Sequence, residues 1–218
     1  MSIGGSILGE AYDGFFDPIG LVQQSVSNGQ PVLYVAMNYR LGVFGFAAAD
    51  VLNKAKSENN GLRDQLLALE WVKDNIAAFG GNPKLVTLLG QSFGAISVGM
   101  QMIAYGGEKE ALFHKAIMTS SGVSGKARTD HLAADNTAAV AADVKCIAPN
   151  GTVDAAALEC LKKAPISDLN SVQLAQAKKS KPSYGFASFG PVVDGDIIPD
   201  EPDKLLAEGK FLKSKSMK

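Results

Sequence analysis

The chain has 218 residues, and its 21 Lys and Arg against 22 Asp and Glu leave a formal net charge of −1 at pH 7. Apolar residues make up 46% of it, which is enough for a globular core, but no apolar run approaches the roughly 20 residues of a membrane helix. The near-neutral charge excludes the basic footprint of a dedicated nucleic-acid binder, and the first residues lack the basic start of a signal peptide.

Apolar runs and helical periodicities alternate through the first half of the chain. The run 32–37 predicts a buried strand, apolar residues at three- and four-residue spacing predict a helix over 62–79, and the run 84–89 predicts a second strand. A helix over 95–105 and a third strand over 116–119 follow. Strands that alternate with helices predict a mainly parallel sheet with helices on its faces.

The second half of the chain has a different composition. Residues 127–180 are rich in Ala and predict helices outside the sheet, one of them over 154–163. The stretch 189–196 is rich in turn-forming residues, and 204–208 predicts a short helix. We see no internal repeat, so we expect one domain over 1–218 with 127–180 as its peripheral helical region.

The two cysteines, Cys146 and Cys160, lie 14 positions apart, with turn-forming residues between them. This spacing permits a disulfide loop, and it equally permits two unrelated free thiols.

The most informative motif is the pentapeptide Gly90-Gln91-Ser92-Phe93-Gly94, a GxSxG sequence between a predicted strand and a predicted helix. A serine at such a sharp strand-to-helix turn projects its hydroxyl above the sheet, beside the free N–H groups of the helix N-terminus. Ser92 is therefore the candidate nucleophile of an acyl transfer. The alternative is a plain strand-to-helix turn, because GxSxG alone is a weak pattern.

A glycine pair near the N-terminus is the second candidate element. Gly4 and Gly5 could aim two backbone N–H groups at the oxyanion of a reacting ester, together with the N–H of Phe93. By itself the pair equally suits an N-terminal loop, so its meaning depends on Ser92.

Several longer motifs, in the same order, resemble the type-B carboxylesterase and lipase family, and most closely its fungal secreted members. They are NYRLGVFGF (38–46), NGLRDQ (60–65), WVKDNIAAFGGNP (71–83), GQSFGA (90–95), LFHKAIM (112–118) and FGPVVDG (189–195). The resemblance covers nearly the whole chain, and it leaves little room for a third interpretation, an unrelated α/β domain with a chance GxSxG.

The resemblance implies an α/β-hydrolase fold and hydrolysis of carboxylic esters, either small molecules or lipids, through an acyl-serine intermediate of the EC 3.1.1 type. It implies no metal and no cofactor. By position, Ser92 matches the nucleophile, and Gly4, Gly5 and Phe93 match the oxyanion hole.

The resemblance also bears on the cysteines and on the compartment. Cys146 and Cys160 match a disulfide loop that recurs in the family, which implies a secreted, oxidising environment for the full-length parent. It does not decide the oligomeric state.

The chain departs from the family pattern at three positions. It has Gln91 where the family usually has Glu, Phe93 where it usually has Ala, and Ile3 where it commonly has Gly. The N–H of Phe93 can still donate, since a backbone donor does not depend on the side chain. Its ring is hypothesised to narrow the acyl pocket.

A general base and an acid for Ser92 are difficult to find in the sequence. Of the two histidines, His114 lies in a stretch that the family uses structurally. His131, with Asp130 beside it and with Glu108 and Glu110 upstream, satisfies the chain order nucleophile, acid, histidine of α/β-hydrolases. It falls in the peripheral helical region, however, so we favour neither histidine as the base.

The resemblance places the triad Glu and His beyond the end of this sequence, and the strand that leads into the glycine-rich loop before its start. We therefore expect the 218 residues alone to be poorly stable, aggregation-prone or dependent on another chain, because central strand edges would lack partners. The leading interpretation is an incomplete ester hydrolase. The alternative is a catalytically inactive hydrolase-fold binding module or a non-functional truncated product.

Overall fold

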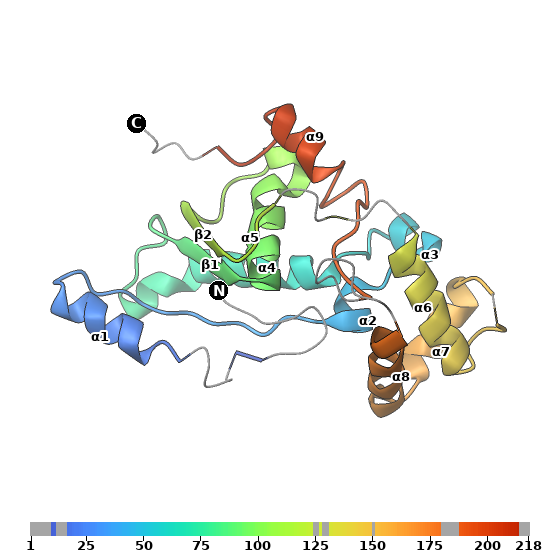
Figure 1. The fold of residues 1–218 in the computed structure, drawn as a ribbon. Helices are drawn as coiled ribbons and strands as arrows, with labels where there is room; N and C mark the ends of the chain where they lie inside the picture. Colours follow the sequence, from blue (N-terminus) through green and yellow to red (C-terminus); the bar gives the residue numbers. More distant parts are fainter. Residues whose placement is uncertain are drawn as a thin grey trace.

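Two parallel strands run through the middle of the molecule, and helices pack beside them (Figure 1). This computed structural model describes residues 10–11, 17–123, 127, 131–149, 151–179 and 188–213. The elements in chain order are α1 (Ile19–Ser27), α2 (Gly42–Phe46), α3 (Asp50–Lys54), α4 (Asn60–Asn75), η2 (Ile76–Phe79), β1 (Thr87–Gln91), α5 (Phe93–Ile103), η3 (Ala104–Gly107), β2 (Lys115–Thr119), α6 (Leu132–Asp143), α7 (Ala155–Lys163), α8 (Ile166–Lys179) and α9 (Pro202–Ala207).

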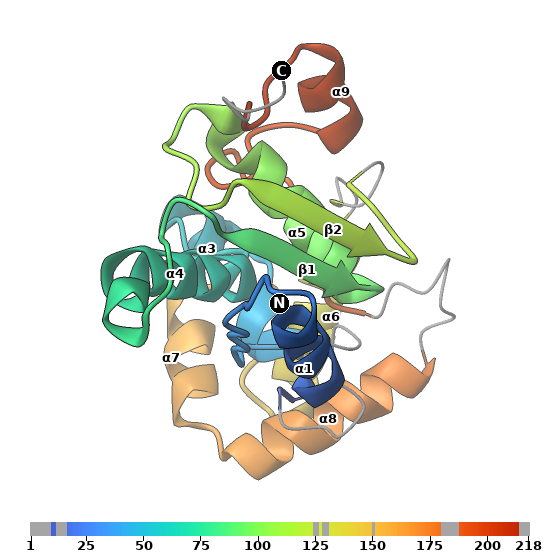
Figure 2. The ribbon, with the colours of Figure 1, turned by 90° about the vertical axis from the view of Figure 1, so that its left-hand side faces the viewer.

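The strands β1 and β2 pair in parallel, from Thr87 opposite Lys115 to Gln91 opposite Thr119. The helix α5 connects them and lies behind them in Figure 2, in contact with both. This strand–helix–strand unit confirms the predicted parallel order, and it leaves the carboxyl ends of both strands on the same side.

The second predicted strand forms with shifted bounds, 87–91 instead of 84–89. The side chain of Asn82 accepts a hydrogen bond from the N–H of Lys84 at 2.9 Å, and its carbonyl accepts one from Leu85 at 3.0 Å. This local turn consumes the first predicted strand residues. At the other end, pairing with β2 extends the strand to Gln91.

The strand predicted over 32–37 is wrong, because this segment forms no strand. It runs as an extended connection from α1 towards α2 (Figure 1), and Val32 and Leu33 are 47% and 51% exposed. A strand exists only where a second strand completes its hydrogen-bond ladder. Among the described residues none pairs with this segment.

The helices α6, α7 and α8 gather at one end of the molecule, away from β1 and β2 (Figures 1 and 2). A disulfide joins Cys146, which follows α6, to Cys160 on α7, so the bond that the family resemblance implied is present. The side chain of Gln173 on α8 accepts a hydrogen bond from the N–H of Val43 at 2.8 Å. This contact connects the helical group to α2.

A side-chain amide joins two distant segments in the core. Asn59 is 1% exposed, and its amide donates to the carbonyl of Val192 and accepts from the N–H of Val192, both at 2.9 Å. These two hydrogen bonds resemble the pair that two residues exchange in an antiparallel β-sheet, and they join residues 133 positions apart in the sequence. It holds Asn59 in the left-handed conformation, with φ of 53°.

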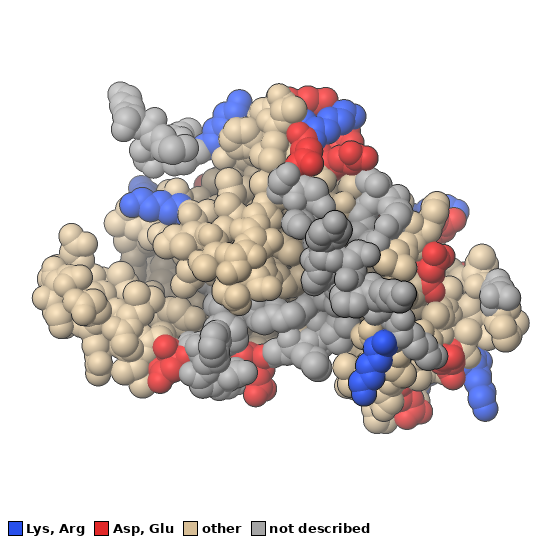
Figure 3. Space-filling view, in the orientation of Figure 1, with Lys and Arg blue, Asp and Glu red and all other residues tan. Residues whose placement is uncertain are grey.

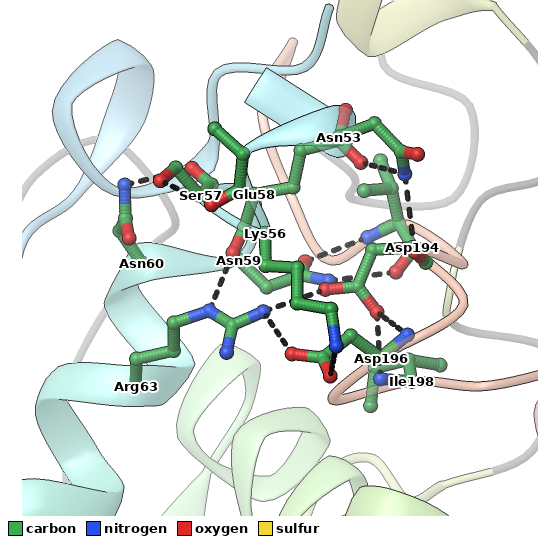
Figure 4. A network of polar contacts seen from close by, with 12 residues as sticks. Asn53, Lys56, Ser57, Glu58, Asn59, Asn60, Arg63, Asp194, Asp196 and Ile198 are labelled. Carbon is green, nitrogen blue, oxygen red and sulfur yellow. Dashed lines mark hydrogen bonds and ion pairs between the residues drawn. The ribbon is translucent and has the colours of Figure 1, made fainter. Parts of the chain in front are cut away.

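A charged network surrounds this pair (Figure 4). The guanidinium of Arg63 contacts the carboxylate of Asp194 at 3.2 Å and that of Asp196 at 3.0 Å, and its Nε donates to the carbonyl of Glu58 at 3.0 Å. Burial raises the pKa of Glu58, and a hydrogen bond from Asn53 opposes the rise. The network fixes the turn-rich stretch 189–196 against the start of α4.

The substitution Asn59→Ala should lower the free energy of unfolding by about 2–4 kcal/mol. It removes both hydrogen bonds to the backbone of Val192 in the core, and Ala tolerates the positive φ at this position less well than Asn does. The measurement is urea unfolding followed by circular dichroism. Asn59→Gly relieves the backbone strain but not the lost hydrogen bonds, so it should recover only part of the loss. A loss below about 1 kcal/mol for Asn59→Ala would contradict this role.

Alkaline pH should destabilise the protein through Tyr39. Burial raises the pKa of this phenol to about 12, from 10.0. A raised folded-state pKa means that the stabilisation is complete below pH 10 and is lost as the pH rises through 12. Between pH 9 and 11 the unfolding free energy should fall by about 1 kcal/mol more in the wild type than in Tyr39→Phe. Equal pH slopes in the two proteins would refute this assignment.

Candidate active site

The carboxyl end of β1 turns abruptly into the first turn of α5, and Ser92 stands alone at this junction. The strand ends at Gln91 and the helix begins at Phe93. Ser92 has φ of 54° and ψ of −117°, a combination that L residues adopt only under steric constraint. This is the geometry of the strand–serine–helix turn that the GxSxG motif predicts.

Three interactions hold the junction in place. A Cβ on Gly90 would lie 2.2 Å from the carbonyl oxygen of Gly94, so only glycine permits this approach of strand and helix. The N–H of Ser92 donates to the carbonyl of Thr119 at 2.9 Å, which connects the junction to the end of β2. The carbonyl of Ser92 accepts from Ala95 and Ile96 and so starts the helix.

The two side chains at the turn have opposite environments. Ser92 is exposed, whereas Phe93 is 5% exposed and packs edge to face against Phe46, with ring centroids 5.5 Å apart. The ring of Phe93 therefore packs in the core of the described residues, and its effect on an acyl pocket stays a prediction. The sequence does not predict the contact of Phe46 with Phe93, because the two residues lie 47 positions apart.

The amide groups at the start of α5 are suited to bind negative charge. Among the described residues, the N–H of Phe93 has no hydrogen-bond acceptor. It belongs to the first turn of a helix, where free N–H groups and the helix dipole favour an anion. The other two predicted donors, Gly4 and Gly5, lie outside the described residues.

His114 occupies the wrong end of the sheet for a base. Its imidazole Nδ1 accepts a hydrogen bond from the backbone N–H of Val86 at 3.3 Å, and the backbone N–H of His114 donates to the Val86 carbonyl at 2.8 Å. Val86 precedes β1 whereas Ser92 follows it, so the two ends are about 20 Å apart along the strand. The structural role predicted for His114 agrees with these contacts.

The remaining acid and base candidates are not in contact with Ser92. Glu108 and Glu110 follow the far end of α5, about 16 Å from its first residue, and Glu110 pairs with Lys73 at 2.8 Å. His131 is exposed and immediately precedes α6, and Asp130 lies outside the described residues. In the described part of the chain, no imidazole or carboxylate is hydrogen-bonded to the Ser92 hydroxyl.

Within the described ranges, no group of three or more His, Cys, Asp or Glu could hold a metal ion, and no helix is long and apolar enough to cross a membrane. On the face shown in Figure 3, the described side chains of both charge signs are scattered and do not form a single patch.

Comparison with known proteins gives consistent matches. The sequence profile described as "Carboxylesterase family" matches residues 4–217. The inactive carboxylesterase-like protein VdtD of Byssochlamys spectabilis is 42% identical over 95% of this chain and 36% of its own length. A secreted lipase of Arthroderma benhamiae is 42% identical over 98% of this chain and 38% of its own length. Lipase 2 of Geotrichum candidum is 39% identical over 88% of this chain and 35% of its own length. The chain thus spans little more than a third of these relatives.

The substitution Gly90→Ala should disrupt the serine junction and lower the free energy of unfolding by about 3 kcal/mol, because the added methyl group overlaps backbone atoms that cannot move independently. Urea unfolding measures the loss. Gly20→Ala is the matched control: no atom lies within 4 Å of its added Cβ, and Ala favours the helix, so a gain of about 0.5 kcal/mol is expected. Equal effects of the two substitutions would show that the close approach at Gly90 is not essential.

Proposed function

The chain belongs to the carboxylesterase family, and we propose that it carries the nucleophile of a serine ester hydrolase, with Ser92 as the attacking residue. The family has the α/β-hydrolase fold, and the described residues form two parallel strands of it with their helices. The proposed substrates are carboxylic esters, either small molecules or lipids.

The single observation that carries the proposal is the conformation of Ser92. Its positive φ holds an exposed hydroxyl at the carboxyl end of β1, while its neighbours on both sides are wholly or partly buried. Backbone strain of this kind costs about 1–3 kcal/mol and is characteristic of functional positions. A plain turn between strand and helix needs no such conformation.

In the proposed reaction, the oxygen of Ser92 attacks the ester carbonyl carbon and its proton passes to a general base. The carbonyl oxygen becomes an oxyanion, to which the N–H of Phe93 donates a hydrogen bond. Collapse of this intermediate breaks the bond to the alcohol, which takes up the proton and leaves an acyl-Ser92. Attack by water on the acyl group then releases the acid and restores Ser92.

The general base and its carboxylate partner belong, in this proposal, to polypeptide outside the described residues. A serine hydroxyl is a weak nucleophile without a base, and the base needs an orienting acid. The positions of His114, Glu108 and Glu110 do not suit these roles. Gly4 and Gly5 remain the proposed partners of Phe93 in the oxyanion hole.

We also propose that the full-length protein is secreted. The disulfide between Cys146 and Cys160 is typical of proteins from oxidising compartments, and the relative from Arthroderma benhamiae is named a secreted lipase.

One observation favours a second candidate function, a catalytically inactive module that binds partners. A relative that is 42% identical carries the name of an inactive carboxylesterase-like protein. A sequence this similar can therefore belong to a protein named as inactive, and the experiment has to separate the two candidates.

The decisive experiment treats the protein isolated from its natural source with a fluorophosphonate probe and with an activated short-chain ester. We expect a covalent adduct on Ser92, identified by mass spectrometry, and loss of ester hydrolysis by several orders of magnitude in Ser92→Ala. Ser167→Ala, at an exposed serine on α8, is the matched control and should retain both properties. Hydrolysis that survives Ser92→Ala would refute the assignment, whereas neither labelling nor hydrolysis in the wild type would favour the inactive module.

The 218-residue chain expressed alone gives an independent measurement. If the base is supplied from outside the described residues, this chain should hydrolyse the ester no faster than Ser92→Ala does. Turnover together with labelling of Ser92 would show that the chain itself contains a working base, and His131 would then be the first residue to substitute.

A further inference from the structure

A group of buried polar side chains lies in the core beside the serine junction, and the proposed reaction does not use them. Tyr39, Gln65, Ser97 and Gln101 are 8%, 0%, 0% and 1% exposed. We refer to them as the polar cluster. Their number is notable because uncompensated polar groups in an apolar core are costly.

The polar cluster joins three separate parts of the chain. Tyr39 precedes α2, Gln65 lies on α4, and Ser97 and Gln101 lie one turn apart on the same face of α5. The amide nitrogen of Gln101 donates to the carbonyl of Leu62 at 2.9 Å and to the amide oxygen of Gln65 at 3.1 Å. These two bonds fix the orientation of both amides, since a reversed Gln101 would set its oxygen against a carbonyl.

Four atoms of the polar cluster have no hydrogen-bond partner in the part of the chain that the structure describes: Tyr39 Oη, Gln65 Nε2, Ser97 Oγ and Gln101 Oε1. The phenol of Tyr39 lies close to Ser97 and Gln65 without forming a hydrogen bond of acceptable geometry to either. Each unpaired buried group costs about 1–3 kcal/mol, so four of them would cancel much of a domain's stability.

The chemical types of these atoms are complementary to a single small molecule. Gln65 Nε2 and the Tyr39 hydroxyl can donate, and Gln101 Oε1 and Ser97 Oγ can accept. Water has two donors and two acceptors, and buried waters typically make about three hydrogen bonds to otherwise unpaired groups.

We propose that the polar cluster is a binding site for one buried water molecule. The water accepts hydrogen bonds from Gln65 and Tyr39 and donates hydrogen bonds to Ser97 and Gln101. It thereby connects α5 to α4 and to the segment that carries Tyr39. Because α5 begins at the residue after Ser92, the water helps to hold the first turns of this helix in their position behind β1.

The direct test is a high-resolution crystal structure of the wild-type protein isolated from its natural source. We expect a solvent peak within hydrogen-bonding distance of Tyr39 Oη, Ser97 Oγ and Gln65 Nε2. If these side chains instead bond directly to one another with no peak between them, the proposal is wrong.

Water relaxation dispersion, which counts long-lived internal waters in solution, provides a second test. The double variant Tyr39→Phe with Ser97→Ala should hold one long-lived water fewer than the wild type. Thr137→Val is the matched control, because Thr137 is 1% exposed but its hydroxyl donates to Ala133 and accepts from Ala48. An unchanged count in the double variant would overturn the proposal.

The single substitution Ser97→Ala gives a third test, in which the direction of the change in the urea midpoint decides. This test does not require the double variant to fold. If water satisfies the hydroxyl, its removal should lower the urea midpoint of unfolding, because a bound water loses a partner. If the hydroxyl were unpaired, its removal would relieve a buried polar group and the midpoint would rise or stay unchanged. A raised or unchanged midpoint therefore counts against the water.

Discussion

The close approach of two backbone segments at Gly90 and Gly94 is the constraint on which the candidate site depends. It brings the first turn of α5 against the end of β1, so that the residue between them has no room for ordinary backbone angles. Ser92 consequently takes a positive φ, and its side chain has to project outward. The outward projection of the hydroxyl and the start of α5 at the next residue both follow from this turn.

The close approach of α5 to β1 is maintained by packing and by hydrogen bonds from residues outside the turn. The carbonyl of Thr119 holds the N–H of Ser92, and the contact of Phe93 with Phe46 anchors the helix from the core side. Gln101 on the last turns of α5 is bonded to α4 through Leu62 and Gln65. A strained residue persists only where its surroundings over-determine it, and α5 is held at its start, along its buried face and near its end.

Local sequence patterns predicted those elements that depend on contacts between residues close together in the chain. The helical spacing of α4 and α5 and the GxSxG turn were predicted, since each depends on residues a few positions apart. The segment 32–37 was predicted wrongly, because its apolar, β-forming residues suit a strand but a ladder needs a second strand. The reciprocal bond of Asn59 with Val192 could not be predicted either, since Asn59 looks like an ordinary turn residue and its partner lies 133 positions away. The prediction for Ser92 is limited in the same way: the GxSxG sequence predicts a nucleophile but does not say which residues fold against it.

The residues that shape the strand–serine–helix turn contribute to the packing of the core. The residues that would activate Ser92 contribute to the proposed reaction. Substitution of Gly90 or Phe46 should damage the packing of the core whether or not the protein is an enzyme. A general base contributes to the reaction and little to the core, so it can be lost without unfolding the protein. A relative that is 42% identical over 95% of this chain is named as inactive. The strand–serine–helix turn is therefore strong evidence for the fold and for the orientation of Ser92, whereas the proposed turnover requires in addition an imidazole that reaches the exposed hydroxyl.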